Sequence, residues 1–578
     1  MVFLDYEVFE YDWLVVFIEP DKQQKTVIVN DEKKLKRFYE KRKKDIWIGY
    51  NIKGYDQFIQ KGILCGFNPK KINDFIIVEG NSGYSYSKLL NDIPMIFYDV
   101  MPADGKSLKQ LEGFLGNSIE ESEIDFNIKR KLTPEEIEKA IKYCTHDVEQ
   151  TIAVFLETFN DFEAAMGLIE MFPESLSIYD LKLTKAQMTA KILECERVSR
   201  DDEFDIKILD GIRIEKYKAA VEFFLNPDNH WYKRGTKKND FTLLIAGLEH
   251  LLGWGGIHAG KKMYHLNAKK AGRLILHVDV ESFYPRLMIF HGLLTRNCKR
   301  PEKFKMIFEK RLALKHAGKK KEQAPLKIVI NGGYGISKDK FSKAYDPRNA
   351  NLVCINGQLL LIDLIEHLEV VPGFELIQSN TDGLIISIPD TDEAFSMVDD
   401  ICYEWETRCN MKLGFDEISE IYEKDVNNYV FRFADGKLER KGKYVKEKTV
   451  IDNDLPIVTK AVVDYLMEKI PVEQTIGGCN DMHEFQMVKK ITSKFEHLYY
   501  DSVINERCVR VYASKNEADP GLKWKSARTG KYGKVTDTPE HCFLVNGDVK
   551  GRPCPDKLDK EWYIAMAKKR INDYGVML

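Results

Sequence analysis

Short runs of β-branched and aromatic residues alternate with an amphipathic helical segment over about the first 165 residues. Strand-like runs, separated by turn residues, occupy residues 2–9, 13–19, 26–29 and 46–50. Apolar residues then recur with helical spacing at Ile137, Ile141 and Val148, in a run that begins with the start signal Thr133-Pro134-Glu135-Glu136. This order of elements predicts an α/β domain.

The pattern changes in the middle of the chain. Residues 166 to about 270 are predicted to be helical and end in Gly253-Trp254-Gly255-Gly256, which is typical of a hinge or a tight linker. An apolar strand follows at 274–280. Two further strand-like runs, 374–378 and 384–388, flank Ser379-Asn380-Thr381-Asp382-Gly383, whose composition predicts a hairpin turn with a carboxylate at its tip.

The last part of the chain is mixed. Beyond about residue 450, helical spacing appears at 458–470 and 559–574, and the sequence shows no internal repeat or low-complexity tract. Since a domain takes about 150 residues, a chain of 578 residues is expected to form roughly four domains.

Composition narrows the class of protein. Hydrophobic residues make up 44% of the chain and charged residues 31%, which excludes wholesale disorder, a collagen-like repeat and a disulfide scaffold. The eleven cysteines include no CxxC pair, so we expect reduced, mostly buried thiols in a cytoplasmic protein. No signal peptide is apparent, and polar residues interrupt the longest apolar stretch, so membrane insertion is not expected.

Acidic residues occur in three short patterns near the N-terminus. Asp5 and Glu7 lie two apart on a predicted strand, so both side chains project from one face. A Mg²⁺ ion would suit such a pair, and two solvated acids on an edge strand are the alternative. Asn51-Ile52-Lys53-Gly54-Tyr55-Asp56 follows a strand, and Tyr143-Cys144-Thr145-His146-Asp147 places Tyr143 and Asp147 one helical turn apart.

These patterns, in this order, resemble the three motifs of the DnaQ-like (RNase H-like) 3′→5′ exonuclease domain attached to family B DNA polymerases. The resemblance implies that two divalent metal ions are bound by four carboxylates, namely Asp5, Glu7, Asp56 and Asp147. The metals would activate the attacking water for an in-line displacement. Tyr143 would orient that water, and Asn51 would contact DNA. His146 is expected to be a bystander, with a general-base role as the alternative.

A second set of residues lies farther along the chain. Asp279-Val280-Glu281-Ser282-Phe283-Tyr284-Pro285 follows the apolar strand at 274–280, and Lys327, Asn331, Tyr334 and Gly335 form a spaced pattern downstream. Between them, residues 299–322 contain ten lysines and arginines against three glutamates. Within that basic segment, Arg311 and Lys315 are four residues apart and share one helical face.

This set resembles motifs A, B and C of family B DNA polymerases. Phe283 replaces the usual Leu of motif A, and Gly332 replaces the usual Ser of motif B. Asn380-Thr381-Asp382 stands where the Asp-Thr-Asp of motif C belongs, so the site keeps the principal carboxylate, Asp382, and loses one negative charge.

The resemblance also implies a role for each of these residues. Asp279 and Asp382, with the carbonyl of Val280, would hold two Mg²⁺ ions, or Mn²⁺, in the polymerase site, as two ions would be held in the exonuclease site. The residues expected to bind the incoming dNTP are Arg311, Lys315, Lys327, Asn331, Tyr284 and Tyr334. The first three would grip the phosphates, Tyr284 would stack under the sugar, and the other two would line the nascent base pair.

Two further stretches resemble DNA-binding elements of the same family. Trp254-Gly255-Gly256 is similar to the linker motif between exonuclease and polymerase domains, and Lys441-Gly442-Lys443-Tyr444 is similar to a loop that follows the primer–template duplex; Tyr429 lacks a lysine partner in the sequence. The chain is expected to divide into five parts: an exonuclease domain at 1–165, a connecting helical region and linker at 166–270, a palm at 271–298 and 340–450, fingers at 299–339, and a thumb with the C-terminal region at 451–578.

The sequence therefore predicts an α/β exonuclease domain joined to an α+β right-hand polymerase domain, in a compact polymerase of the bacteriophage type. Its expected partners are primer–template DNA and dNTPs, and the chain is expected to be monomeric. A net charge of −3 argues against nucleic acid only when taken alone, because carboxylates gather at the metal sites and cations gather between Lys299 and Lys321. The alternatives are an exonuclease or DNA-binding scaffold with a polymerase site impaired at Asn380, and a primase-like polymerase.

Overall fold

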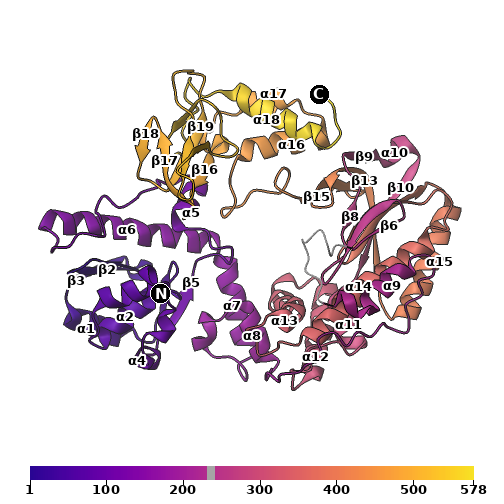
Figure 1. Ribbon diagram of the computed structural model, residues 1–578, viewed down its shortest axis with the longest axis horizontal. Coiled ribbons are helices and arrows are strands. Elements are labelled where there is room, and N and C mark those ends of the chain that lie inside the picture. Colours follow the sequence, from indigo (N-terminus) through magenta and orange to yellow (C-terminus); the bar gives the residue numbers. More distant parts are fainter. Residues whose placement is uncertain (231–240) are drawn as a thin grey trace.

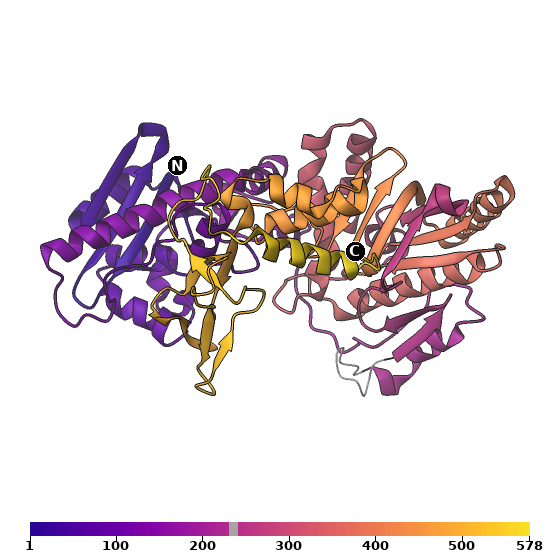
Figure 2. The same ribbon diagram turned by 90° about the horizontal axis from the view of Figure 1, so that it is seen from above.

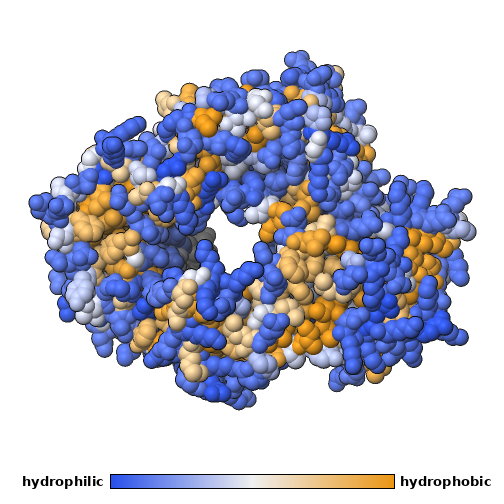
Figure 3. All heavy atoms as spheres, turned by 180° about the vertical axis from the view of Figure 1, so that it is seen from behind, coloured by the Kyte–Doolittle hydropathy of each residue, from blue (hydrophilic) through white to orange (hydrophobic). Residues whose placement is uncertain are grey.

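Three parts of the chain surround a central opening in the computed structural model, which describes residues 1–230 and 241–578. An N-terminal α/β domain, a central domain built on a large sheet, and a C-terminal region follow one another around the opening (Figure 1). The opening passes through the molecule in the space-filling view of Figure 3. Figure 2 shows the N-terminal and central domains at opposite ends, with the C-terminal region between them.

The N-terminal domain is a five-stranded mixed sheet with the order β3-β2-β1-β4-β5. Its strands are β1 (Val2–Val8), β2 (Trp13–Glu19), β3 (Gln24–Val29), β4 (Ile46–Gly49) and β5 (Ile96–Asp99). Its main helices are α1 (Glu32–Arg42), α2 (Asp56–Leu64), α5 (Leu108–Phe114) and α6 (Pro134–Glu157). The first four strands and α6, with its Thr133–Glu136 capping box, confirm the sequence prediction.

The segment expected to be wholly helical is helical only in part. It contains α7 (Phe159–Met171), α8 (Lys185–Ile192) and α9 (Lys218–Leu225), and then the strands β6 (Phe241–Ile245), β7 (Leu248–Leu252), β8 (Ala259–Gly260) and β9 (Tyr264–Asn267). The prediction is therefore wrong for residues 241–267. Strands this short have too few residues to show alternation, and β8 and β9 are fixed by pairing with β11 and β13.

The central domain is built on an eight-stranded sheet, ordered β15-β14-β13-β10-β12-β11-β8, with β9 also paired to β13. The remaining strands are β10 (Arg273–Val280), β11 (Glu375–Asn380), β12 (Gly383–Pro389), β13 (Leu413–Asp425), β14 (Asn428–Phe433) and β15 (Leu438–Lys441). Its helices are α10 (Ala268–Ala271), α11 (Phe283–Phe290), α14 (Pro347–Leu368) and α15 (Asp392–Cys409). The predicted strands and the turn at Thr381 and Asp382 are confirmed.

Helix α14 is the core helix of this domain and packs against α11, α15 and α13 (Lys320–Lys338). By length and composition it could also cross a membrane, but 89% of its most apolar window is buried inside the structure. Burial of that kind is typical of a core helix, and it explains why the apolar run tolerates Asn356 and Asp363, whose side chains form hydrogen bonds to the segment at 207–213.

Two helices, α12 (Pro301–His316) and α13 (Lys320–Lys338), form a pair beside the central sheet. They pack against each other, and α8 packs on α13. The three parts form a ring around the central opening, and this contact joins the N-terminal domain to the central domain along the lower side of that ring (Figure 1). The expected boundaries at 299 and 339 flank the pair, whereas those at 165 and 270 fall inside α7 and α10.

The C-terminal region has a hydrophobic core of its own. Its helices are α16 (Pro456–Glu468), α17 (Val472–Gly478) and α18 (Lys560–Asn572), and two of these confirm the predicted helical runs. Its strands are β16 (Met487–Lys490), β17 (Phe495–Tyr500), β18 (Ser502–Ile504), β19 (Cys508–Ala513), β20 (Lys523–Ser526), β21 (Tyr532–Lys534) and β22 (Cys542–Leu544). They form a three-stranded sheet, β16-β19-β22, and a four-stranded sheet, β18-β17-β20-β21.

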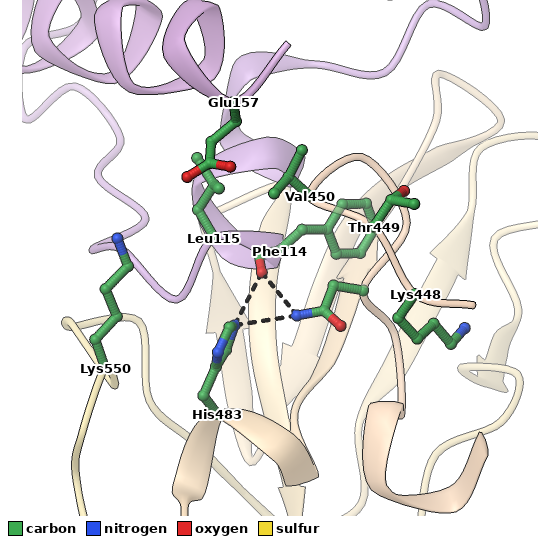
Figure 4. Close-up of a pocket in the computed structure, with 9 residues that line it drawn as sticks. Phe114, Leu115, Glu157, Lys448, Thr449, Val450, His483 and Lys550 are labelled. Carbon is green, nitrogen blue, oxygen red and sulfur yellow. Dashed lines mark hydrogen bonds between the residues drawn. The ribbon is translucent and has the colours of Figure 1, made fainter. Parts of the chain in front are cut away.

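The ring closes where the C-terminal region meets α5. The buried side chain of Arg510 donates hydrogen bonds to the carbonyl oxygens of Gly113 (3.1 Å) and Asn117 (2.7 Å). The carbonyl oxygen of Phe114 receives hydrogen bonds from Asn453 and is 2.9 Å from Nε2 of His483 (Figure 4). Phe114, Asn453 and His483 line a cavity of about 350 Å³ between the two parts.

Candidate functional sites

The predicted carboxylates of the N-terminal domain come together at the centre of its sheet. Asp5 and Glu7 project from β1, and Asp56 is the first residue of α2. The backbone amide of Tyr6, between the two strand acids, donates to Oδ1 of Asp56 at 3.2 Å. Asp147 lies on α6, which packs across β1. We call Asp5, Glu7, Asp56 and Asp147 the N-terminal site.

Burial and mutual repulsion dominate the electrostatics of the N-terminal site. Burial, Glu7, Asp56 and Asp147 raise the pKa of Asp5 well above its usual range, and burial and Asp147 do the same for Glu7. Burial raises the pKa of Asp56 to about 7 and that of Asp147 to about 6. Lys109 lowers the pKa of Glu7 and Asp147 but does not outweigh burial and repulsion, and a bound cation would supply the positive charge that remains lacking.

Lys109, at the start of α5, is a residue of this site that the sequence motifs did not identify. Its Nζ lies 2.5 Å from Oδ1 of Asp147 and 3.1 Å from a carboxylate oxygen of the buried Glu112. It also lies 4.7 Å from the centre of the Tyr143 ring. Among the described residues it is the only cation paired with the site, so it fixes Asp147 and Tyr143 relative to each other. Helical spacing to Glu112 was its only sequence signal.

Tyr143 and His146 lie on α6 beside Asp147 but have different surroundings. Burial and the charges of Asp147, Glu7 and Asp5 raise the pKa of the Tyr143 hydroxyl, which therefore lies at the carboxylates. His146 is within ion-pair distance of Glu112 (3.6 Å) and Glu120 (3.7 Å). Although burial lowers its pKa, these two acids raise it overall.

Asn51, the predicted DNA-binding residue, lies in a loop whose backbone is held by Asp99. Asp99 was not among the residues predicted from the sequence. Asn51 has a left-handed backbone, with φ of 59°. The carboxylate of Asp99, at the end of β5, accepts hydrogen bonds from the backbone amides of Asn51 (2.9 Å) and Lys53 (3.0 Å). Since β4 and β5 are parallel neighbours, Asp99 positions the loop that leads into Asp56.

The predicted carboxylates of the central domain also meet, although 103 residues separate them in the sequence (279 to 382). Asp279 lies near the end of β10, opposite Gly383 of β12. Asp382 lies in the turn between β11 and β12, and its carbonyl oxygen accepts a 2.8 Å hydrogen bond from the amide of Val280. Both carboxylates and Asn380 line a cavity of about 180 Å³. We call Asp279 and Asp382 the central site.

Two acidic residues outside the motifs act on the central site. Burial, Asp382 and Asp416 raise the pKa of Asp279 to about 7, with a smaller contribution from Glu439. Asp416 on β13 is the strand partner of His277 on β10. Because His277 and Asp279 are two apart on β10, Asp416 lies on the same face of the sheet as Asp279. Glu439, on β15, lines the cavity. The charge missing at Asn380 is therefore offset by acids from neighbouring strands.

Arg311 and Lys315, the two basic residues on one face of α12, contact the loop after Asp279. Nη1 of Arg311, which is 9% exposed, donates to Oγ of Ser282 at 3.2 Å, and Nζ of Lys315 lies 3.4 Å from a carboxylate oxygen of Glu281. Lys315 lowers the pKa of Asp279, against the larger effects of burial and the acids. Two of the predicted phosphate-binding residues thus stand beside the central site.

The predicted residues on α13 divide into two groups. Tyr334 packs against Tyr284, with ring centres 4.8 Å apart, and its hydroxyl is 2.7 Å from Sγ of Cys354. Lys327 and Asn331 are exposed, and their side chains form no hydrogen bond or ion pair with another residue in the described part of the chain. Tyr284 and Tyr334 are therefore in contact, whereas the side chains of Lys327 and Asn331 are exposed and accessible to a ligand.

The Trp254-Gly255-Gly256 stretch lies against both the central site and α13. A Cβ on Gly256 would come within 2.5 Å of Oγ1 of Thr381, the residue before Asp382. The side-chain amide of Gln358 donates to the carbonyl oxygen of Gly255 at 2.7 Å, and Nζ of Lys338 donates to that of Trp254 at 2.9 Å. This stretch is therefore a support of the turn that carries Asp382.

The predicted loop at 441–444 makes contacts inside the protein. Nζ of Lys441 lies 5.7 Å from the centre of the Tyr429 ring, and the two residues pair across β14 and β15, so the lysine partner absent near Tyr429 in sequence comes from the next strand. Lys443 pairs with Asp537 at 2.7 Å, and Tyr444 packs against the guanidinium of Arg570 at 4.8 Å. Lys443 and Tyr444 thus connect the central sheet to the C-terminal region.

Two groups of closely spaced donor atoms lie in and beside the N-terminal site, and both include its carboxylates. Oxygen atoms of Asp5 and Glu7 lie within 4.8 Å of each other and of Sγ of Cys144, and ligand atoms of Asp147, Glu112 and His146 are equally close to one another. Carboxylate oxygens are the ligands that Mg²⁺ prefers. The central site offers Asp279 and Asp382 with the Asn380 amide at one cavity wall, which also suits a hard cation.

Of the comparisons with known proteins, only the comparison with solved structures finds matches. No family model and no curated protein matches the chain. Among solved structures, 205 chains match. One is the structure of the family B DNA polymerase from the hyperthermophilic archaeon Pyrobaculum calidifontis, with 13% sequence identity and a TM-score of 0.41, covering 99% of this chain and 77% of that chain. The function of the chain is therefore inferred from its own residues.

Proposed function

We propose that the chain is a template-directed DNA polymerase that adds dNTPs to a primer 3′-hydroxyl and carries a proofreading 3′→5′ exonuclease. One observation carries the proposal. Residues from three separated stretches meet at the end of β10. Asp279 and Asp382 are joined through the Val280–Asp382 hydrogen bond of 2.8 Å, and Arg311, Lys315 and Tyr334 contact the stretch 281–284. A second, independent carboxylate site lies in another domain.

The central site supplies what phosphoryl transfer requires. Catalysis of that reaction depends on positioning and on neutralising charge. Asp279 and Asp382 would hold divalent cations, which would offset the charge that develops on the phosphates. Arg311 and Lys315 stand beside the motif that carries Asp279, and the exposed Lys327 and Asn331 lie on the adjoining helix. These residues would bind the triphosphate and the nascent base pair.

The N-terminal site suits hydrolysis of a phosphodiester. Its four carboxylates would hold two Mg²⁺ ions. Tyr143, whose ring lies 4.7 Å from Nζ of the lysine that pairs with Asp147, would orient a water molecule. Lys109 holds Asp147 in place. In this proposal the C-terminal region acts as the thumb, the chain works as a monomer in the cytoplasm, and the enzyme is of the compact bacteriophage type.

Extension of a labelled primer on a singly primed template with Mg²⁺ tests the proposal. The intact protein is expected to lengthen the primer when dNTPs are present and to shorten it when they are absent. Shortening without extension would instead support an exonuclease whose polymerase site is impaired at Asn380. Products formed without any primer would support a primase-like polymerase.

A further inference from the structure

The hairpin formed by β20 and β21 is the most basic short segment of the C-terminal region. Residues 523–534 contain five cations and no acid; the cations are Lys523, Lys525, Arg528, Lys531 and Lys534. The hairpin belongs to the sheet β18-β17-β20-β21. Figure 1 shows β16 of the adjoining sheet next to α5 of the N-terminal domain, and the two elements pack together.

Strand register separates this sheet into two chemically different faces. Lys523 is paired with Tyr499 on one side and with Lys534 on the other, and Lys525 is paired with Tyr532. Directly paired residues point to the same face, as do residues two apart on one strand. Cations and tyrosines therefore share the outer face.

The opposite face is apolar and supplies the packing of the sheet. Leu498 pairs with Trp524, and Leu498 is fully buried. The Trp524 ring covers Gly533, where a Cβ would come within 2.6 Å of it. Trp524 also packs against Phe495, with ring centres 4.4 Å apart. The apolar packing that stabilises the sheet thus comes from this inner face, and the cations of the outer face take no part in that packing.

Most cations of the hairpin are left without an ion-pair partner. Lys525 pairs with Glu496 at 2.7 Å, whereas Lys523 and Lys534 on the outer face, and Arg528 and Lys531 in the turn, form no ion pair with any residue in the described ranges, 1–230 and 241–578. Lys523 stands directly opposite Lys534, and like charges in such positions destabilise a sheet. An anion bound at this face would relieve that repulsion.

The aromatic side chains of the same face are arranged for stacking. Tyr532 is 50% exposed, and its ring centre lies 5.2 Å from that of Tyr499 and 6.0 Å from that of His497. Exposed aromatic rings among unpaired cations are the features that bind single-stranded nucleic acid, because bases stack on the rings and phosphates meet the cations. A duplex keeps its bases inside and would leave the rings unused.

The C-terminal region that carries this sheet also contacts the helix beside the N-terminal site. Strands β16 and β19, which belong to the other C-terminal sheet, pack on α5, the helix that carries Lys109 and Glu112. At the base of the sheet, an open groove of about 680 Å³ is lined in part by Lys490, Phe495 and Arg507. Arg507 immediately precedes β19, which begins at Cys508 and packs on α5, so the groove lies next to a strand that contacts this helix.

We propose that the outer face of the sheet β18-β17-β20-β21 binds single-stranded nucleic acid through Tyr532, Tyr499, Lys523 and Lys534, and leads its 3′ end to the N-terminal site. The binding itself follows from the sheet alone. Delivery of the 3′ end rests on the proposed exonuclease function.

Binding of a fluorescent oligothymidylate of about 12 nucleotides, a length within the usual range for a single-strand site, tests the first part. The measurement is anisotropy of the full chain in EDTA, so that no hydrolysis occurs. Tyr532→Ala is expected to weaken binding about tenfold, because stacking of one base contributes that order of affinity. The control Tyr403→Ala removes a 70% exposed tyrosine from α15 and is expected to leave affinity unchanged.

Lys534→Glu gives a readout that a structural role would not produce. It replaces a like-charge pair by an opposite one, so the melting temperature is expected to rise while affinity falls and the slope of log Kd against log salt decreases. The double variant Lys269→Ser/Lys270→Ser, on α10, is the matched control. If Tyr532→Ala and Lys534→Glu both bind as the wild type does, the proposal is wrong.

Hydrolysis separates this proposal from the proposed function. Tyr532→Ala is expected to slow digestion of the oligonucleotide and to leave unchanged the cleavage of thymidine 5′-p-nitrophenyl phosphate, which is too small to reach the sheet. Equal loss on both substrates would overturn delivery. If the wild type cleaves neither substrate with Mg²⁺, the exonuclease function fails and delivery fails with it, while the anisotropy result still decides whether the face binds a single strand.

Discussion

The amide of Val280 donates a 2.8 Å hydrogen bond to the carbonyl oxygen of Asp382. This bond ties the end of β10, which carries Asp279, to the turn that carries Asp382. The two carboxylates therefore keep a fixed separation without a side-chain contact between them. Repulsion between them, added to burial and to Asp416, raises the pKa of Asp279 to about 7, which is the condition that a bound cation would relieve.

Asn380→Asp restores a carboxylate at the wall of the cavity that holds Asp279 and Asp382. The added charge is expected to lower the Mg²⁺ concentration for half-maximal primer extension by about tenfold, with a smaller effect for Mn²⁺, since ligand charge strengthens binding of a hard cation. Metal titrations of the initial rate measure this. An unchanged metal dependence would mean that residue 380 lies outside the metal site.

Gly256→Ala is expected to reduce primer extension at least about tenfold, because overpacking costs about 1–3 kcal/mol. The new Cβ would lie 2.5 Å from Oγ1 of Thr381 and would displace the turn that carries Asp382. Gly478→Ala is the control, since a Cβ there meets nothing within 4 Å. Digestion of single-stranded DNA by the Gly256 variant should stay at the wild-type rate; loss of both activities would point to general misfolding instead.

Lys109→Ala removes the cation that pairs with Asp147. The pKa of Asp147, already about 6 because burial outweighs Lys109, is then expected to rise. The acidic limb of the pH–rate profile for digestion should move to higher pH, and the rate at pH 7 should fall by about tenfold or more, as expected for loss of a charge-assisted hydrogen bond. Lys106→Ala, which removes a lysine paired with Asp104 on the surface, should leave the profile in place.

Asp56→Asn is expected to stabilise the protein in EDTA at pH 8. Burial raises the pKa of Asp56 to about 7 in the folded state, against about 3.9 when unfolded. The folded state therefore binds more protons between pH 4 and 7, and the free energy of unfolding falls as pH rises through that window. Three pKa units correspond to at most about 4 kcal/mol.

Urea unfolding at pH 3.5 and pH 8 measures the effect of the Asp56 variant. The gain should be present at pH 8 and largely absent below pH 4. Added Mg²⁺ should stabilise the wild type more than the variant, because the variant lacks one ligand charge. A variant that is less stable than the wild type at pH 8 would contradict the electrostatic account of the N-terminal site.

Sequence patterns predicted the parts of the fold that depend on local alternation. The strands β1, β2, β10 and β12 and the turn at Asp382 follow from apolar runs bounded by turn residues. The strands β8 and β9 did not, because two and four residues carry no period and their pairing is decided by distant strands.

The same distinction applies to the sites. Asp5, Asp56, Asp147, Asp279 and Asp382 were predicted because motif spacing marks them. Lys109, Asp99 and Asp416 were missed, since each reaches its site only through tertiary packing or strand pairing. Lys441 shows the limit most simply: it completes the pair with Tyr429 across two strands, at a distance in sequence that no spacing rule covers.

The most direct test of the two-site account compares Asp279→Ala and Asp5→Ala in one assay, with a labelled primer on a template, Mg²⁺, and dNTPs present or absent. Asp279→Ala is expected to lose extension by at least about a hundredfold and to keep digestion. Asp5→Ala is expected to lose digestion and to keep extension. Extension that persists in Asp279→Ala, or loss of both activities in either folded variant, would contradict the assignment of one chemistry to each site.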